Sequence, residues 1–172
     1  MAYPVPKRIT EGDLDVAGYD GEVVFPVEVS LQNVDAGATL RLKLDYATCE
    51  KICLPAHADL ALDLPALVAS ADAALLQTFS TRVPRAVSAA DVSEITAVTR
   101  ETPDTWRVIP KDVGAQDLFV EAPEGFFVTT KRDGDGFRLT IAEHPADRVV
   151  PDAIRVTLAS PQPIEFTLAL PQ

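Results

Sequence analysis

Apolar and polar residues alternate with a period of two along most of the chain, the pattern of half-buried β-strands. The first half contains three such segments, residues 22–31 ("EVVFPVEVSL"), 39–46 ("TLRLKLDY") and 59–65 ("DLALDLP"). The second half contains six, at residues 106–109, 117–122, 126–132, 136–144, 153–160 and 163–171. Strands at about ten-residue spacing, separated by Gly, Pro and Asp, are typical of antiparallel immunoglobulin-like sandwiches. The sequence therefore predicts a mainly β fold, with one or two such sandwiches.

One segment departs from this period and predicts a helix. Residues 66–82 are rich in alanine, and Leu67, Ala71, Leu75 and Phe79 recur every four residues, as on one face of an amphipathic helix. The residues that follow are mostly small and polar, which is typical of a linker. We therefore expect a β-region at 1–65, a helix and linker at 66–90, and a second sandwich-like domain at 91–172.

Charge and hydropathy exclude several classes of function. Fifteen Lys and Arg residues against 26 Asp and Glu give a net charge of −11, with no basic cluster, so nucleic acid and anionic membranes are repelled. Charged residues interrupt every apolar stretch well before the ~20 residues that a membrane-spanning helix requires. The first residues lack the apolar segment of a secretory signal, which predicts either a cytosolic protein or a piece of a longer one.

Both cysteines of the chain, Cys49 and Cys53, lie in the connection between the second and third predicted strands. A disulfide that closes a loop of about five residues stabilises a fold by only roughly 2 kcal/mol, so a purely structural cross-link contributes little here. In a tight turn the two thiols could instead form an exchangeable redox pair. With His57 they could also bind Cu(I) or zinc, although Pro55 disrupts a helix that would present all three ligands. The spacing alone leaves the three interpretations open.

Residues around the cysteines have both a structural and a functional interpretation. Tyr46 is either a strand-end core residue or a wall that shields the disulfide, and Tyr19 is either a loop anchor or part of the same site. Glu50 and Lys51 are either a solvated loop tip or the point where a partner docks. Pro55 stiffens the chain after the second cysteine, because it restricts the preceding residue to extended conformations.

Several sequence elements together resemble one known family. They are "YPVPKRI" at residues 3–9, Tyr19 before "GEVVFPV", and the pattern Y-x-x-C-x-x-x-C-x-P followed by an alternating strand. In this order they resemble the amino-terminal periplasmic region of DsbD-type thiol:disulfide interchange proteins, especially the ScsB-like branch. The similarity covers residues 3–65.

The resemblance implies a protein-disulfide reductase of the periplasm, the soluble part of an inner-membrane protein. A membrane-embedded domain of the same protein, usually acting through a thioredoxin-like domain, would supply its electrons. Cys49 and Cys53 would pass these electrons to periplasmic thioredoxin-fold proteins, with Cys53 as the cysteine that joins the partner and no cofactor besides the disulfide. The alternative is a periplasmic copper-binding module, involved in copper tolerance, that uses both cysteines and His57.

The sequence also departs from the family pattern in two ways. The three-residue gap between the cysteines is narrower than in DsbD itself, which favours the ScsB-like branch. Family members usually have strands before the P-x-P-K-R element. We therefore expect a partial chain, whose first sandwich is incomplete or is completed by another molecule.

Overall fold

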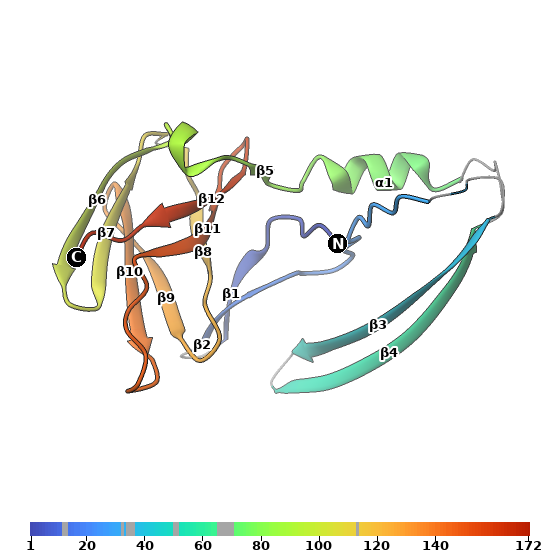
Figure 1. Cartoon of the computed structure of the whole chain (residues 1–172), viewed down its shortest axis with the longest axis horizontal. Coiled ribbons are helices and arrows are strands. Elements are labelled where there is room, and N and C mark those ends of the chain that lie inside the picture. The colour runs from blue at the N-terminus through green and yellow to red at the C-terminus, as the bar shows by residue number, and fades with distance from the viewer. Residues whose placement is uncertain (12–13, 32, 34–36, 50–51, 65–70, 113) are drawn as a thin grey trace.

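The computed structural model describes residues 1–11, 14–31, 33, 37–49, 52–64, 71–112 and 114–172 (Figure 1). The described residues form mainly β-structure with one short α-helix, as the sequence predicted. The strands are β1 (Lys7–Glu11), β2 (Leu14–Gly18), β3 (Ala38–Cys49), β4 (Cys53–Leu64), β5 (Arg85–Ala86), β6 (Ile95–Thr102), β7 (Thr105–Pro110), β8 (Asp117–Glu121), β9 (Phe127–Asp133), β10 (Gly136–Glu143), β11 (Ala153–Ala159) and β12 (Ile164–Ala169). The helix α1 spans Ala73–Ser80, and a 3₁₀ turn spans Ala89–Asp91.

The second half of the chain is a β-sandwich of two four-stranded sheets (Figure 1). One sheet has the order β6-β7-β10-β9 and the other has the order β5-β12-β11-β8, with all neighbours antiparallel except β5 and β12. Side chains from both sheets fill the space between them, and the largest fully buried ones are Trp106, Val108, Leu118, Phe137, Leu139, Val156 and Leu158. Burying each side chain of this size contributes roughly 1.5–3 kcal/mol, so this core dominates the stability of the described fold.

Alternation and turn chemistry explain how these strands form. Along β7, buried and half-buried residues alternate strictly, with Trp106 and Val108 facing the core. Strands β9 and β10 are joined through the pair Asp133 and Gly136, which leaves only Gly134 and Asp135 in the turn. Gly134 has a φ of 61°, a left-handed conformation that glycine adopts without steric cost. Strands β9 and β10 therefore form a hairpin with a two-residue turn.

The helix is shorter than the sequence predicted. Helix α1 ends at Ser80, close to the expected end, while residues 65–70 lie outside the described part of the chain. Phe79 is its buried residue, and the guanidinium carbon of Arg82 lies 4.5 Å from the centre of the Phe79 ring. The backbone N–H of Val5 donates to the carbonyl of Arg82, which ties the end of the helix to the start of the chain.

The predicted strand at residues 22–31 was wrong, and four strands form where we predicted none. Residues 22–31 have the expected alternation but form no strand, and side chains on this segment are open to solvent, with Val27 52% exposed. A strand needs a hydrogen-bonded neighbour, and residues 22–31 pair with no other strand among the described residues. In the other direction, β1, β2, β5 and β6 form where we predicted no strand, and the small and polar residues of β6 hide its alternation.

The side chain of Arg8 attaches the short β1–β2 hairpin to the sandwich. The guanidinium of Arg8 donates to both carboxylate oxygens of Asp117, at 2.8 and 2.7 Å, and to Oγ1 of Thr130 at 2.8 Å. Its central carbon also lies 5.5 Å from the centre of the Phe119 ring. The hydrogen bond to Asp117 raises the pKa of Arg8, so its guanidinium remains charged. Arg8 therefore connects the amino-terminal region to strands β8 and β9.

Candidate functional site

The two cysteines lie at the closed end of the long β3–β4 hairpin (Figure 1). The antiparallel register runs without interruption from Ala38 opposite Leu64 to Cys49 opposite Cys53. Our prediction of a longer connection between the strands was therefore wrong, because only residues 50–52 join them. Cys49 ends β3 and Cys53 begins β4, so the register itself places the two cysteines directly opposite each other.

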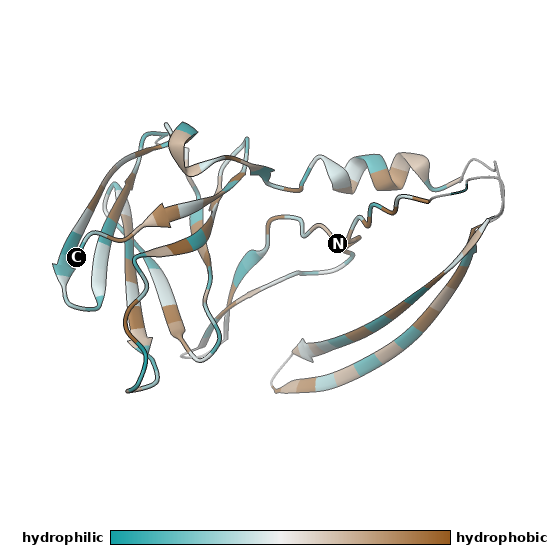
Figure 2. Cartoon of the chain, viewed as in Figure 1, coloured by the Kyte–Doolittle hydropathy of each residue, from teal (hydrophilic) through white to brown (hydrophobic). Residues whose placement is uncertain are grey.

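The hairpin has one apolar and one polar face, and their residues alternate along both strands (Figure 2). The apolar face consists of Ala38, Leu40, Leu42, Leu44, Tyr46 and Thr48 on β3 and Leu54, Ala56, Ala58, Leu60, Leu62 and Leu64 on β4. Leu54, Leu60 and Leu62 are 56%, 56% and 58% exposed, so the described residues leave much of this face uncovered. The cysteines share the opposite, polar face, since directly paired residues project to the same side.

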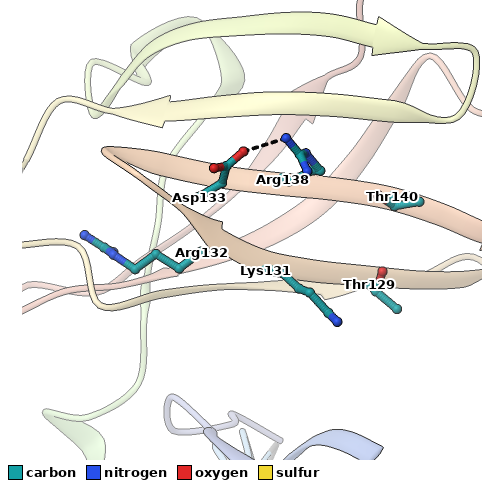
Figure 3. A pocket seen from close by; sticks show the side chains of 6 residues that line it. All are labelled: Thr129, Lys131, Arg132, Asp133, Arg138 and Thr140. Carbon is teal, nitrogen blue, oxygen red and sulfur yellow. Dashed lines mark ion pairs between the residues drawn. The ribbon is translucent and has the colours of Figure 1, made fainter. Parts of the chain in front are cut away.

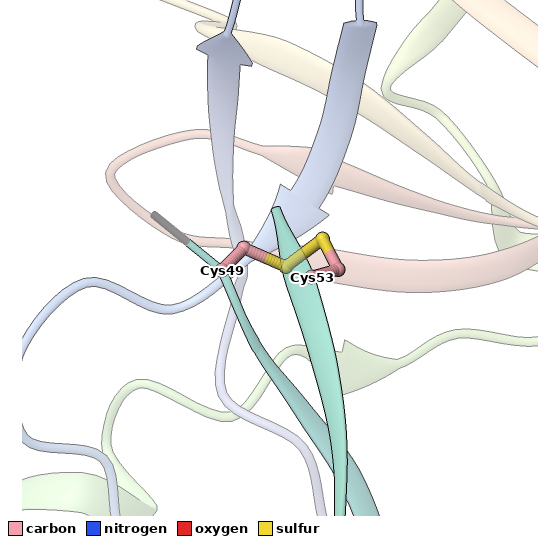
Figure 4. The surroundings of a disulfide bond; sticks show 2 residues. All are labelled: Cys49 and Cys53. Atoms are coloured by element: carbon pink, nitrogen blue, oxygen red, sulfur yellow. A yellow bond between two sulfur atoms is a disulfide. The ribbon is translucent and has the colours of Figure 1, made fainter. Parts of the chain in front are cut away.

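Cys49 and Cys53 form a disulfide across the end of the hairpin (Figure 4). Their Cα atoms lie 4.1 Å apart, and both residues are exposed. The next pair on the same face is Ala47 and Pro55, which are also exposed. Because these neighbours are small and carry no charge, they leave the disulfide open to a thiolate that approaches from the polar face.

Among the described residues of the polar face, the charged groups nearest to the disulfide surround His57. Nδ1 of His57 lies 2.7 Å from a carboxylate oxygen of Asp45, and Nε2 lies 3.2 Å from one of Asp59. His57 is four residues along β4 from Cys53, which corresponds to about 13 Å in an extended strand. The described residues contain no group of three or more side chains suited to a metal ion. The geometry thus gives no support to the alternative metal site formed by Cys49, Cys53 and His57.

The structure separates the other predicted site residues. Tyr46 is 44% exposed and belongs to the apolar face, on the other side of the hairpin from the disulfide. Glu50 and Lys51 lie outside the described residues. The hydroxyl of Tyr19 donates to the carbonyl of Pro4 at 2.8 Å, and burial raises the pKa of Tyr19. Tyr19 therefore anchors the amino-terminal segment through a hydrogen bond of its own.

A hollow on the outer face of strands β9 and β10 offers a different kind of surface (Figure 3). It is lined by Thr129, Lys131, Arg132, Asp133, Arg138 and Thr140. Arg138 pairs with Asp133 at 2.7 Å and with Glu101 at 3.1 Å, so its charge is compensated. The hollow contains no thiol or histidine. The reactive group of the described chain is therefore the disulfide.

Sequence reasoning missed two features of the structure, one at the disulfide and one at the amino-terminal hairpin. The first is the exact pairing of Cys49 with Cys53, which depends on a register that alternation alone does not fix. The second is Arg8, which we noted only as part of the P-x-P-K-R element. Its position two residues after Pro6 gave no signal that it pairs with Asp117, 109 residues further along the chain.

Comparisons with known proteins agree with this geometry. The family model described as "Thiol:disulfide interchange protein DsbD, N-terminal" matches residues 1–65, which confirms the resemblance seen in the sequence. The crystal structure of the N-terminal periplasmic domain of ScsB from Proteus mirabilis has a similar fold. Its TM-score is 0.67 at 20% sequence identity, and the match covers 99% of this chain and 72% of that chain. A comparison with the curated proteins found no match.

Proposed function

We propose that the chain is a disulfide reductase domain of the periplasm. The premise is that residues 1–65 belong to the DsbD amino-terminal family. The observation that supports this most strongly is the exposed Cys49–Cys53 disulfide at the end of the hairpin, within the region that matches the family. A disulfide that spans so few residues adds little stability, and exposed disulfides are the ones that exchange readily.

The proposed reaction starts from the reduced dithiol. The thiolate of Cys53 attacks one sulfur of the partner's disulfide, forming a mixed disulfide and releasing one partner thiolate. The Cys49 thiolate then attacks the Cys53 sulfur, which forms the Cys49–Cys53 disulfide and releases the second partner thiolate. The partner gains two electrons and its thiolates take up two protons, while the domain loses two electrons. The direct pairing of the two cysteines in the register supports rapid closure of the second step.

The electrons that restore the dithiol come, in this proposal, from a membrane-embedded domain and a thioredoxin-like domain of the same parent protein. The substrates are periplasmic thioredoxin-fold proteins. Among the described residues, no helix has the length and apolar character needed to cross a membrane. In this proposal, which follows from the family resemblance, the domain lies in the periplasm as a soluble part of an inner-membrane protein, and residues 91–172 form a second domain that supports it.

The other predicted residues have supporting roles in this proposal. Pro55 limits the freedom of the chain next to Cys53, and Glu50 and Lys51 are in sequence positions where a partner meets the hairpin end. Tyr19 holds the amino-terminal segment through Pro4. Tyr46, on the apolar face, is a candidate for shielding the disulfide only from that side of the hairpin.

A comparison of protein and small-molecule disulfides tests this function. The reduced chain is mixed with oxidised protein disulfide isomerase, a thioredoxin-fold protein, or with oxidised glutathione at the same concentration. We expect formation of the Cys49–Cys53 disulfide to be at least about tenfold faster with the thioredoxin-fold protein, because a docked partner aligns the sulfurs. The rates are measured by quenching with acid and counting free thiols by mass spectrometry. Equal rates with the two oxidants would contradict a reductase that acts on thioredoxin-fold proteins.

A further inference from the structure

The polar face of the β3–β4 hairpin is the side from which a partner can reach the disulfide. Cys49 and Cys53 project from this face together with Asp45, His57 and Asp59. Leucines occupy the opposite face. A segment that packs over these leucines therefore leaves the polar face and the disulfide accessible. A partner that reaches the sulfurs from this side lies along the hairpin, over the small side chains of Ala47 and Pro55.

Among the residues that the structure describes, the carboxylate closest to the disulfide along the polar face is that of Asp45. The side chain of Asp45 is 89% exposed, and its contact with His57 at 2.7 Å fixes its direction. Asp45 and Cys49 are four residues apart in the same strand, so their Cα atoms are separated by about 13 Å. The remaining charged side chains on this face are Asp59 and Lys43, which are paired in the register, and then Arg41 and Asp63 further from the tip.

We propose that Asp45 is a specificity-determining residue that selects partners with a cationic side chain about four extended residues from their reactive cysteine. This inference rests on the proposed exchange at Cys49 and Cys53. A Lys or Arg at that place in the partner reaches the Asp45 carboxylate when the two reactive sulfurs meet. An acidic side chain at the same place is repelled, so the charge discriminates between partners as well as attracting the right ones.

Short thiol peptides test the inference directly. The peptides Cys-Ala-Ser-Ala-Lys, Cys-Ala-Ser-Ala-Glu and Cys-Ala-Ser-Ala-Gln, with blocked ends, differ only in the charge four residues from the thiol. Each peptide thiolate opens the Cys49–Cys53 disulfide by forming a mixed disulfide and releasing one cysteine thiolate, which is the reverse of the proposed step. The rate constant for opening is measured on the oxidised full chain at low ionic strength. The reaction of each peptide with 2-hydroxyethyl disulfide corrects for differences in thiol reactivity.

We expect the lysine peptide to react about fivefold faster than the glutamate peptide, and Asp45→Asn to reduce this ratio about threefold, as for an exposed ion pair. Asp63→Asn is the matched control, because Asp63 lies on the same face but ten residues from Cys53. It should leave the ratio unchanged. In about 1 M salt, where charges are screened within about 3 Å, the ratio should approach one for every variant.

The outcomes separate this inference from the proposed function. If the glutamine peptide opens the disulfide readily but Asp45→Asn leaves the lysine-to-glutamate ratio unchanged, exchange stands and the role of Asp45 is overturned. If Asp63→Asn lowers the ratio as much as Asp45→Asn, the effect is one of net charge, and the inference is overturned as well. If the glutamine peptide fails to open the disulfide in any variant, the proposed exchange itself is overturned.

Discussion

Replacing Cys49 by serine is expected to trap the domain on its partner. In this variant Cys53 still attacks the partner's disulfide, but no second thiol lies opposite it to release the product. The mixed disulfide with oxidised protein disulfide isomerase should therefore accumulate in stoichiometric amounts, as measured by mass spectrometry. The Cys53→Ser variant should form its mixed disulfide at least about tenfold more slowly, since the family resemblance assigns the attack to Cys53. The double variant should form none.

The folding of these variants is expected to change little, so differences in their rates of mixed-disulfide formation report on the cysteines themselves. The sandwich core begins at Trp106, and no cysteine contributes to it. Loss of the disulfide removes a constraint on a loop of about five residues, worth roughly 2 kcal/mol and confined to the hairpin. Faster trapping by Cys53→Ser would reverse the assignment of the nucleophile. Complete two-electron transfer by either single variant would contradict the proposed use of both cysteines.

Removing the Arg8 side chain is expected to release the β1–β2 hairpin from the sandwich. Arg8→Ala leaves the carboxylate of Asp117, which is 18% exposed, without its cation, and it removes the hydrogen bond that Arg8 donates to Oγ1 of Thr130. Losing charge-assisted hydrogen bonds at a partly exposed site costs about 2 kcal/mol, after allowing for solvent screening. Hydrogen exchange of the β1 and β2 amides should therefore become about 30-fold faster, while exchange in the sandwich core remains slow.

Two variants serve as controls for this prediction. Lys7→Ala removes the neighbouring cation, whose contact with Asp20 is 3.9 Å long and solvent-exposed, so it should change exchange very little. Arg8→Lys keeps the charge but loses the two parallel hydrogen bonds to Asp117, so its effect should lie between those of Lys7→Ala and Arg8→Ala. Unchanged protection of β1 and β2 in Arg8→Ala would show that other contacts hold this hairpin in place.

The alternation of the sequence predicts strands well only where a pairing partner exists. Strands β3, β4 and β7 to β12 lie where the period of two indicates them, because both the pattern and a neighbouring strand are present. Residues 22–31 have an equally regular pattern but no partner strand among the described residues. The period of a sequence contains no information about which strand will pair with it. Strand β6 shows the reverse case, since its pairing with β7 compensates for a weak pattern.

The candidate site was predictable in its residues but not in its geometry. Two cysteines with three residues between them indicated a redox pair, a metal site or a structural disulfide, and only the register of the hairpin shows that they lie directly opposite each other. The same register places Asp45 and His57 on the face of the disulfide and Tyr46 on the other face. A shift of one residue would exchange these faces, so no argument from spacing alone assigns the side chains to one side.

The reduction potential of the Cys49–Cys53 pair tests the central claim most directly. The oxidised full chain is equilibrated in glutathione and dithiothreitol redox buffers, and the fraction of free thiols is measured by mass spectrometry after acid quenching. We predict a midpoint potential of about −200 mV, within the range of exchangeable disulfides in thiol:disulfide oxidoreductases. A midpoint below about −300 mV, typical of structural disulfides, would contradict the proposed electron transfer through this pair.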